Sequence, residues 1–255
     1  MTARDRKACK GKVEVLRKRF TGARLEPVVL DLMCKESMDG LVESIKKEDK
    51  LDILVNNSGV YFPGMTDKNS LELTMQTNYH GTKYLTEKLL DKALINKNGK
   101  IVFVSSGMGK FDNIPYSNPL AYSILKRYQT DLKTEELDLV IRKYEEDFSD
   151  PNKQHLWHPN IYSSSKLFIS LYSMILGRDP RVTSKNIQVY SCCPGYCHTD
   201  MTKNMDSKAY HTYLDGGKRV YNLISNPKPV DPTLQGRFFN SSGKLESLAA
   251  PTSLD

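Results

Sequence analysis

Short apolar segments alternate with helical ones along this chain, and that alternation limits its fold more than any other feature. The expected strands lie at residues 26–31, 51–55, 100–104, 186–190 and 236–240. The expected helices lie at residues 6–20, 35–47, 70–95, 159–177 and 206–225. Continuous apolar runs are typical of strands buried on both sides. The pattern therefore predicts an α/β fold, a parallel sheet covered by helices on both faces.

One long interval interrupts this alternation. Residues 108–159 are too numerous for a plain loop, and they contain helical patterns at 122–131 and 134–148. We therefore expect a helical insertion within a single domain of residues 1–255, which shows no internal repeat and no linker. The polar tail from Ser241 is expected to be loose.

The formal net charge of +7 is compatible with a nucleic-acid partner or with an anionic cofactor. Many basic residues lie between positions 4 and 24, where Val13, Leu16 and Phe20 recur at helical spacing. That spacing favours a solvated helix face, and we find no basic run interleaved with aromatic residues that could stack on bases. We therefore expect no nucleic-acid partner.

The five cysteines are odd in number and irregular in spacing, which argues against a disulfide framework and for a reducing compartment. Cys193 and Cys197 lie near His198, but a fourth ligand and a common zinc spacing are missing, so no metal site is expected. No uncharged apolar run approaches the ~20 residues of a membrane helix, and the N-terminal residues have no apolar signal core. We expect a cytoplasmic protein without a membrane contact.

Polar or turn-forming residues follow four of the expected strands. Asp31 ends the first strand, Asn57 follows the second, Ser106 follows the third, and Pro194-Gly195 follow the fourth. Each of these alone is an ordinary turn signal. Ligands of open α/β sheets bind beyond the carboxyl ends of the strands, so the four together predict a ligand site at that edge.

Tyr162 and Lys166 are four residues apart in a helical pattern, which puts a phenol and an ammonium on one helical face. A free tyrosine has a pKa near ~10 and is a poor acid-base catalyst at neutral pH. A positive charge nearby favours the phenolate, so we expect the pKa of Tyr162 to be lowered. The pair could then transfer a proton at physiological pH.

Six motifs occur in one order: Thr2-Ala3-Arg4-Asp5, Asn56-Asn57-Ser58-Gly59, Thr77-Asn78-Tyr79-His80-Gly81-Thr82, Val104-Ser105-Ser106, Tyr162-x-x-x-Lys166 and Cys192-Cys193-Pro194-Gly195-Tyr196-x-x-Thr199-Asp200. Over nearly the whole chain they resemble the short-chain dehydrogenase/reductase family, and within it the monomeric NADPH-dependent carbonyl reductases. The resemblance implies a Rossmann-like doubly wound sheet and reduction of aldehydes, ketones or quinones to alcohols with NADPH. It also implies a monomer, because the insertion of carbonyl reductases covers the surface that other members use to oligomerise.

The resemblance assigns a role to each of four catalytic candidates. Tyr162 would donate the proton to the substrate carbonyl, and Lys166 would lower the pKa of Tyr162 and hydrogen-bond the nicotinamide ribose. Ser106 would polarise the carbonyl oxygen, with its neighbour Ser105 as the alternative. Asn78 would position Lys166 through a water molecule. Donors aimed at that oxygen stabilise the alkoxide that develops as hydride arrives.

The resemblance also implies contacts along the cofactor. Asp31 and Leu32 would lie at the adenine, and Asn57 near the adenosine ribose. The nicotinamide end would be contacted by Tyr162, Lys166, Pro194, Gly195, Cys197 and Thr199. Arg4 would face the 2′-phosphate, which arginine suits geometrically, and this favours NADPH over NADH; alternatively, Arg4 is a solvated terminal residue.

The substrate walls would come from the insertion and from residues 201–213. Tyr196, Met201 and Trp157 are candidates, although each could equally be a packing residue. The identity of the carbonyl substrate does not follow from these residues.

The chain departs from the family pattern at its start. It lacks the strand, glycine-rich turn of the form Thr-Gly-x-x-x-Gly-x-Gly, helix and second strand with which the family begins. We therefore expect a first strand-helix-strand unit of about 30 residues to be missing, so that the cofactor diphosphate loses its glycine loop and strand edges are exposed. Two interpretations stay open: an incomplete record of a longer reductase, or a catalytically impaired interaction or regulatory protein. The complete set of catalytic candidates favours the first.

Overall fold

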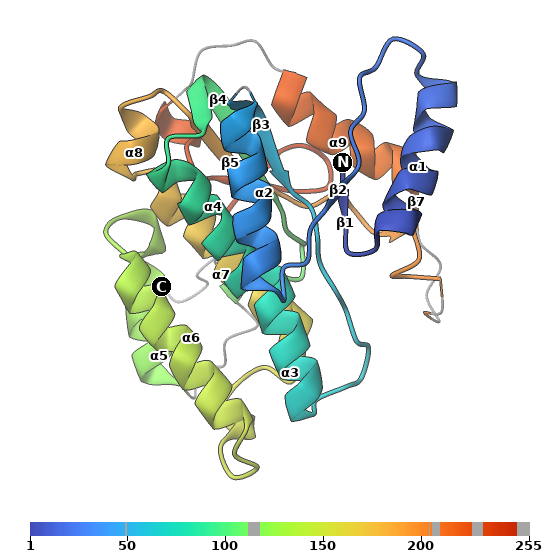
Figure 1. The fold of residues 1–255 in the computed structure, drawn as a ribbon. Helices are drawn as coiled ribbons and strands as arrows, with labels where there is room; N and C mark the ends of the chain where they lie inside the picture. Colours follow the sequence, from blue (N-terminus) through green and yellow to red (C-terminus); the bar gives the residue numbers. More distant parts are fainter. Residues whose placement is uncertain (49, 112–117, 204, 206–209, 226–231, 249–255) are drawn as a thin grey trace.

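A five-stranded sheet forms the centre of the protein (Figure 1). The computed structural model describes residues 1–48, 50–111, 118–203, 205, 210–225 and 232–248. The sheet has the order β3 (Leu51–Asn56), β4 (Ile95–Val104), β5 (Gln188–Cys192), β8 (Phe238–Phe239) and β9 (Leu245–Glu246). All neighbouring strands are parallel except β8 and β9, which are antiparallel. The predicted parallel sheet of a doubly wound α/β fold is confirmed.

Helices cover both faces of this sheet, as predicted. On one face Ile101 and Phe103 of β4 are fully buried in a core that includes α2 (Lys35–Lys47), α3 (Lys68–Met75), α4 (Gly81–Asp91) and α7 (Ile161–Leu176). On the other face Val102 and Tyr190 pack against Val220 and Leu223 of α9 (Tyr213–Ser225). Because successive side chains of a strand point to opposite faces, a continuous apolar run serves both cores.

The N-terminal segment forms a small sheet of its own. β1 (Thr2–Ala3) pairs in parallel with β2 (Val28–Val29), and α1 (Arg6–Arg19) packs on both strands. Within the part of the chain that the structure describes, β3 has no strand partner other than β4. Ile53 and Val55, alternate residues of β3, are 41% and 38% exposed. One face of β3 is therefore incompletely covered.

The helix predicted at 70–95 is wrong in two respects. It is divided by a π-helical turn, η1 (Gln76–His80), between α3 and α4. It also ends early, because Ala93 adopts a positive φ of 53° and Ile95 already belongs to β4. Asn98 has a positive φ of 62° and lies within β4, where the register with β3 shifts. A π turn depends on local side-chain packing and leaves no simple periodicity in the sequence.

The region between Ser106 and Tyr162 contains α5 (Pro119–Leu125), a short helical turn η3 (Lys126–Gln129) and α6 (Thr134–Phe148). Residues 112–117 of the predicted insertion lie outside the described residues. α6 packs on α7 and is joined to the central helices by polar contacts. Asp138 accepts hydrogen bonds from Tyr79 and Lys83, and Glu145 lies 2.7 Å from His80. The insertion is thereby fastened to η1 and α4.

Three further boundaries differ from the sequence prediction. β5 begins at Gln188, because Asn186 has a positive φ of 56° and ends the preceding turn. A short helix, α8 (Pro180–Thr183), was not predicted. The tail from Ser241 is not loose as far as Leu248: it contains β9, and Leu248 is buried and accepts a hydrogen bond from the backbone of Phe111.

Of the helix predicted at 206–225, residues 213–225 form α9, whereas 206–209 lie outside the described residues. All five cysteines are free thiols. Among the helices that the structure describes, none is both long and apolar enough to cross a bilayer.

Candidate active site

Tyr162 lies in the first turn of α7, the most deeply buried helix of the protein. The side chain of Asn160 caps this helix by accepting a hydrogen bond from the amide of Ser163 at 3.1 Å. Nearly all side chains from Ser163 to Leu176 are buried. α7 is therefore held on most sides, and its first turn presents Tyr162 at a fixed place beyond the carboxyl ends of β4 and β5.

Three groups surround the Tyr162 side chain. The Ser106 hydroxyl lies beside its phenol and acts to lower the pKa of Tyr162. The ring of Tyr61 lies 4.8 Å away between centroids, and the Lys166 ammonium nitrogen lies 5.5 Å from the centroid of the Tyr162 ring. The structure thus brings together three of the four catalytic candidates. It adds Tyr61, which follows the expected Asn-Asn-Ser-Gly turn but was not identified from the sequence.

The expected lowering of the pKa of Tyr162 is wrong for the protein without a bound ligand. Burial raises the pKa of Tyr162 to about 12, although the Ser106 hydroxyl acts in the opposite direction. Desolvation disfavours the phenolate more than the hydroxyl stabilises it. Tyr162 is therefore a protonated phenol at neutral pH.

The environment of Lys166 explains why its positive charge does not lower the pKa of Tyr162. Its side chain is fully enclosed, and its Nζ donates a hydrogen bond to the carbonyl oxygen of Val104 at 2.8 Å. Burial lowers the pKa of Lys166 to about 8. The same desolvation that raises the pKa of the phenol thus weakens the positive charge beside it.

The two serines after β4 have different environments. Ser105 is buried, donates a hydrogen bond to the carbonyl oxygen of Lys166 and lies 2.7 Å from the hydroxyl of Ser170. It therefore fastens β4 to α7. Ser106 is half-buried, faces Tyr162 and accepts a hydrogen bond from the amide of Met108. Of the pair, Ser106 has the geometry for contact with a ligand.

Asn78 lies in the π turn η1 and is almost fully buried. Its amide oxygen accepts from the backbone of Val60 at 2.8 Å, and its amide nitrogen donates to the carbonyl oxygen of Val60 at 3.0 Å. The same nitrogen donates to Ser165. A side chain on Gly59 would lie 3.3 Å from both the Asn78 oxygen and the Lys166 nitrogen. Asn78 thus fixes the turn after β3 and stands close to Lys166.

The residues predicted at the adenine end share one cavity of about 240 Å³. Arg4, Asp31 and Leu32 line this cavity together with Ser58, Gly59 and other residues of the neighbouring segments. The backbone of Leu32 is held by Gln76, whose amide donates to the Leu32 carbonyl oxygen at 3.0 Å. Asn57 is exposed and does not line this cavity.

The segment after β5 has a separate architecture. Gly195 has a positive φ of 89°, and the Cys197 thiol donates to the carbonyl oxygen of Pro194. β6 (Cys197–His198) pairs with β7 (His211–Thr212), and the exposed Thr199 donates its backbone amide to Thr202 at 3.0 Å. Pro194, Gly195, Cys197 and Thr199 thus lie on one ordered turn beyond β5.

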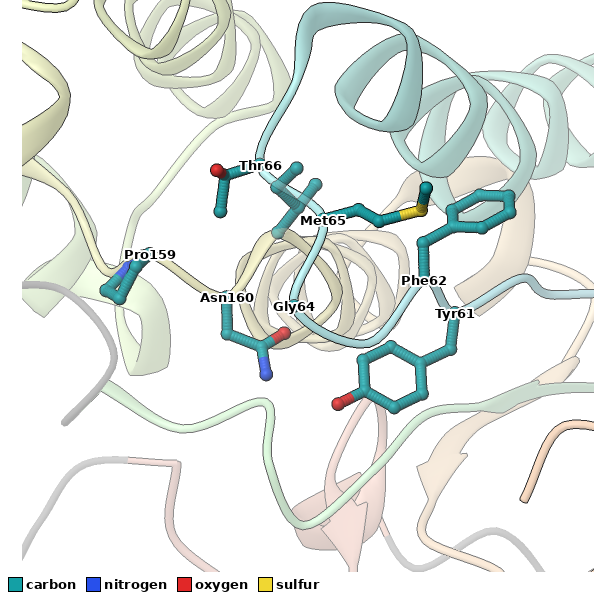
Figure 2. Close-up of a pocket in the computed structure, with 8 residues that line it drawn as sticks. Tyr61, Phe62, Gly64, Met65, Thr66, Pro159 and Asn160 are labelled. Carbon is teal, nitrogen blue, oxygen red and sulfur yellow. The ribbon is translucent and has the colours of Figure 1, made fainter. Parts of the chain in front are cut away.

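A second cavity, of about 210 Å³, opens between the loop after β3 and the start of α7. Figure 2 shows Tyr61, Phe62 and Met65 on the loop after β3, and Pro159 and Asn160 on the segment that leads into α7. Tyr61 lines this cavity and also contacts the Tyr162 ring, so the cavity lies next to Tyr162. Its lining is mostly apolar.

Of the three candidates for the substrate wall, Trp157 is a packing residue. It is 2% exposed, its ring packs on Tyr144, and its indole nitrogen donates to Asp147. Tyr196 is half-buried with its ring near that of Tyr210, and Met201 is 38% exposed. Residues 204 and 206–209 of the predicted wall lie outside the described residues.

Comparison with known proteins identifies the family. The sequence profile of the short chain dehydrogenases matches residues 1–126. Carbonyl reductase (NADPH) 1 of Sus scrofa is 30% identical over 211 residues, which span 79% of this chain and 70% of the relative. (+)-Neomenthol dehydrogenase of Capsicum annuum is 28% identical, with 89% of this chain and 83% of the relative covered.

A solved structure shares the whole fold. Salutaridine reductase from Papaver somniferum superposes with a TM-score of 0.78 at 24% sequence identity, covering 93% of this chain and 89% of the other. Sequence and fold agree with the motifs at the carboxyl edge of the sheet. The chain belongs to the short-chain dehydrogenase/reductase family of oxidoreductase enzymes and resembles the carbonyl reductases within it.

Proposed function

We propose that this protein reduces carbonyl compounds (aldehydes, ketones or quinones) to alcohols with NADPH, and that Tyr162 is the proton donor. One observation carries the proposal: the protonated phenol of Tyr162 lies beside the Ser106 hydroxyl and near the buried amine of Lys166, at the edge where ligands of α/β sheets bind. Relatives whose names include NADPH and carbonyl reductase support both the cofactor and the reaction.

The residues at the adenine end fit NADPH. The cavity lined by Arg4, Asp31 and Leu32 has a guanidinium at its rim, which suits a phosphate, and buried apolar surface beneath it for a planar base. Asn57 would contact the adenosine ribose from outside this cavity. Pro194, Gly195, Cys197 and Thr199 would contact the nicotinamide end, where Gly195 gives the backbone its left-handed turn.

NADPH, when bound, supplies the hydride. The chain's own residues handle the proton and the charge on oxygen. The Ser106 hydroxyl would donate a hydrogen bond to the substrate oxygen and so stabilise the developing alkoxide. Tyr162 holds its proton at neutral pH because its pKa is about 12, and it would deliver that proton to the same oxygen.

Lys166 and Asn78 would act through Tyr162 and the cofactor. Lys166 has a pKa of about 8, so it can bind and release a proton near neutral pH, and its position suits contact with the nicotinamide ribose. A bound dinucleotide carries negative charge, which favours the ammonium form and thereby the phenolate. Asn78 would keep the turn after β3 in place beside Lys166.

The cavity beside Tyr61 supports an apolar substrate. Its walls are aromatic and aliphatic side chains, and Tyr61 joins it to the ring of Tyr162. Tyr196 and Met201 are proposed for the opposite wall. We further propose a cytoplasmic monomer: α6 is fastened over η1 and α4 by Asp138 and Glu145, which leaves that surface unavailable to a second copy.

A turnover assay tests the proposal. The purified chain is incubated with NADPH and, in parallel, with menadione, an aromatic aldehyde and an aliphatic ketone, and loss of NADPH is matched to the reduced product. We expect stoichiometric reduction of at least one substrate. A cooperatively folded chain that reduces none of them would instead favour a binding role, for which the exposed Ile53 and Val55 of β3 offer a surface.

A further inference from the structure

Arg219 is a cation at the edge of the proposed site. It lies on α9 and is half-buried. Among the described residues, no carboxylate forms an ion pair with it. Asp215, one turn earlier, uses its carboxylate to accept from the amide and hydroxyl of Thr212. Half-buried arginines usually have a carboxylate or phosphate partner, because a desolvated charge is costly.

The guanidinium is nevertheless held in one place. One terminal nitrogen donates to the carbonyl oxygen of Pro194. The other lies 3.3 Å and 3.2 Å from the two ring nitrogens of His211. This nitrogen is therefore within hydrogen-bond distance of the imidazole. Among the described residues, no hydrogen bond is formed by the Arg219 Nε–H, so this donor can reach a ligand.

Gly195 makes this position possible. A side chain at Gly195 would collide with the guanidinium of Arg219 and with the ring of His211. The positive φ of Gly195 and the pairing of β6 with β7 bring Pro194, His211 and Arg219 together. The arrangement is an ordered turn that carries a positive charge, directly beyond the carboxyl end of β5.

We propose that Arg219, held against His211 beside Gly195, binds the diphosphate group of the dinucleotide. This inference rests on the proposed function and extends it. Arg4 stands at the adenine end and Lys166 at the nicotinamide end, so the diphosphate that joins the two ends needs a donor set of its own. A planar guanidinium provides two parallel donors to phosphate oxygens, which suits this group.

The opposing interpretation is that Arg219 is a structural strut that only braces Pro194. The two interpretations differ in what a neutral replacement changes. Loss of a strut lowers the free energy of unfolding of the ligand-free protein. Loss of a phosphate-binding arginine weakens phosphate binding. It leaves the free energy of unfolding of the ligand-free protein nearly unchanged, because only one hydrogen bond to a carbonyl is removed.

The test compares Arg219→Met and Arg219→Lys with Arg142→Met. Arg142 is an exposed arginine of α6, so its replacement causes the same change in net charge away from the site. Each variant is titrated with NADPH, followed by NADPH fluorescence, and with inorganic pyrophosphate, followed by phosphorus NMR. Thermal unfolding without ligand is measured alongside. We expect Arg219→Met to weaken both ligands at least ~10-fold, Arg219→Lys less, and Arg142→Met to change neither.

Each outcome decides the inference. Undiminished NADPH and pyrophosphate binding by a folded Arg219→Met variant would overturn it while the proposed function stands. If the unaltered chain fails to bind NADPH, the proposed function fails, and pyrophosphate then decides: binding that depends on Arg219 supports an anion site, and no binding rejects it. If Arg219→Met loses both stability and binding, Arg219→Lys decides between the two interpretations. Phosphate binding that returns in Arg219→Lys supports the anion site. Stability that returns in Arg219→Lys without phosphate binding supports the structural role.

Discussion

The helix α7 and the N-terminal unit of α1, β1 and β2 both contribute to the proposed site, but they are built very differently. From Ser163 to Leu176 nearly every side chain of α7 is buried, whereas in α1 only Cys9 and Val13 are. α7 packs on β4, β5, α3 and α6, and α1 packs mainly on the two short strands beside it. The proposed reacting groups are thus held by the well-packed core. The residues proposed to contact the adenine end of the cofactor are held by a lightly packed unit.

This contrast assigns different jobs to the two regions. A proton donor needs a fixed position and a controlled environment, and burial in the core sets the pKa of Tyr162 and of Lys166 in opposite directions. A residue that selects a phosphate needs only a charge at an accessible rim, as Arg4 has. Changes in the first region should therefore affect chemistry and stability, and changes in the second should affect cofactor binding.

The largest effect is expected from Tyr162→Phe. Removing the phenol oxygen eliminates the proposed proton donor but keeps the ring in its contact with Tyr61. Turnover should fall by about 10²–10⁴-fold, with NADPH affinity and unfolding temperature nearly unchanged. Steady-state kinetics and NADPH titration measure both. Tyr84→Phe, which removes a hydroxyl bonded to Asp39 far from the site, is the matched control. Turnover near the unaltered level in Tyr162→Phe would refute the role.

Core truncation sharpens the contrast in stability. Phe168 of α7 is fully buried between the rings of Tyr79 and Tyr144, so Phe168→Ala should lower the free energy of unfolding by about 3–5 kcal/mol. Val13→Ala removes two methyl groups from the lightly packed α1 and should cost about 2 kcal/mol or less. Denaturant unfolding measures both. Equal decreases in the free energy of unfolding would show that α1 belongs to the same cooperative core as α7, and would contradict the contrast between the two regions.

The pKa values of the core predict a pH dependence of stability. Burial lowers the pKa of Lys166 from 10.5 to about 8, so between these values the unfolded chain binds more protons than the folded one. The contribution of Lys166 to the free energy of unfolding should therefore increase with pH across that window, by about 3 kcal/mol in total. Tyr162 acts oppositely above its unfolded pKa of 10.0, because its folded pKa is raised to about 12 and the unfolded chain loses its proton first.

The measurement is the difference in free energy of unfolding between the unaltered protein and Lys166→Met, from about pH 7 to about pH 10, which cancels most other titrating groups. The difference should grow in favour of the unaltered protein as the pH rises. Parallel curves would mean that Lys166 is solvated and that its pKa is close to the ordinary value.

The smallest effect is expected in the N-terminal region. Arg4→Gln should weaken NADPH binding by about 10-fold and leave NADH binding and thermal stability unchanged, because Arg4 is exposed and would contact only the 2′-phosphate. Arg6→Gln, another exposed arginine two residues along, is the control. Equal weakening of NADPH and NADH by Arg4→Gln would assign Arg4 a role other than selection of the 2′-phosphate.

The sequence predicted best where one physical pattern decides the outcome. α2 occupies residues 35–47 as predicted, because its apolar residues follow helical spacing without interruption. The placement of Asp31 and Ser106 follows from the rule that parallel strands end at one edge of the sheet. Their grouping with Arg4 and Tyr162, respectively, was implied by the family resemblance, and the structure brings each pair together.

Burial and non-local packing account for what the sequence could not predict. The direction of the pKa shift of Tyr162 depends on how completely α7 is enclosed, which the spacing of Tyr162 and Lys166 does not encode. The π turn at Asn78 leaves no simple periodicity in the sequence, and β9 is a two-residue strand that pairs with β8 within a polar stretch. Arg219 has no local motif, and only the turn at Gly195 brings it to the site.

Direct binding of NADPH to this chain is the measurement that tests the account most directly. NADPH fluorescence is followed during titration of the purified protein, with cooperative unfolding measured on the same sample. The account predicts saturable binding of one NADPH per chain, retained by Tyr162→Phe and weakened by Arg4→Gln. A chain that unfolds cooperatively yet shows no saturable binding of NADPH would contradict it.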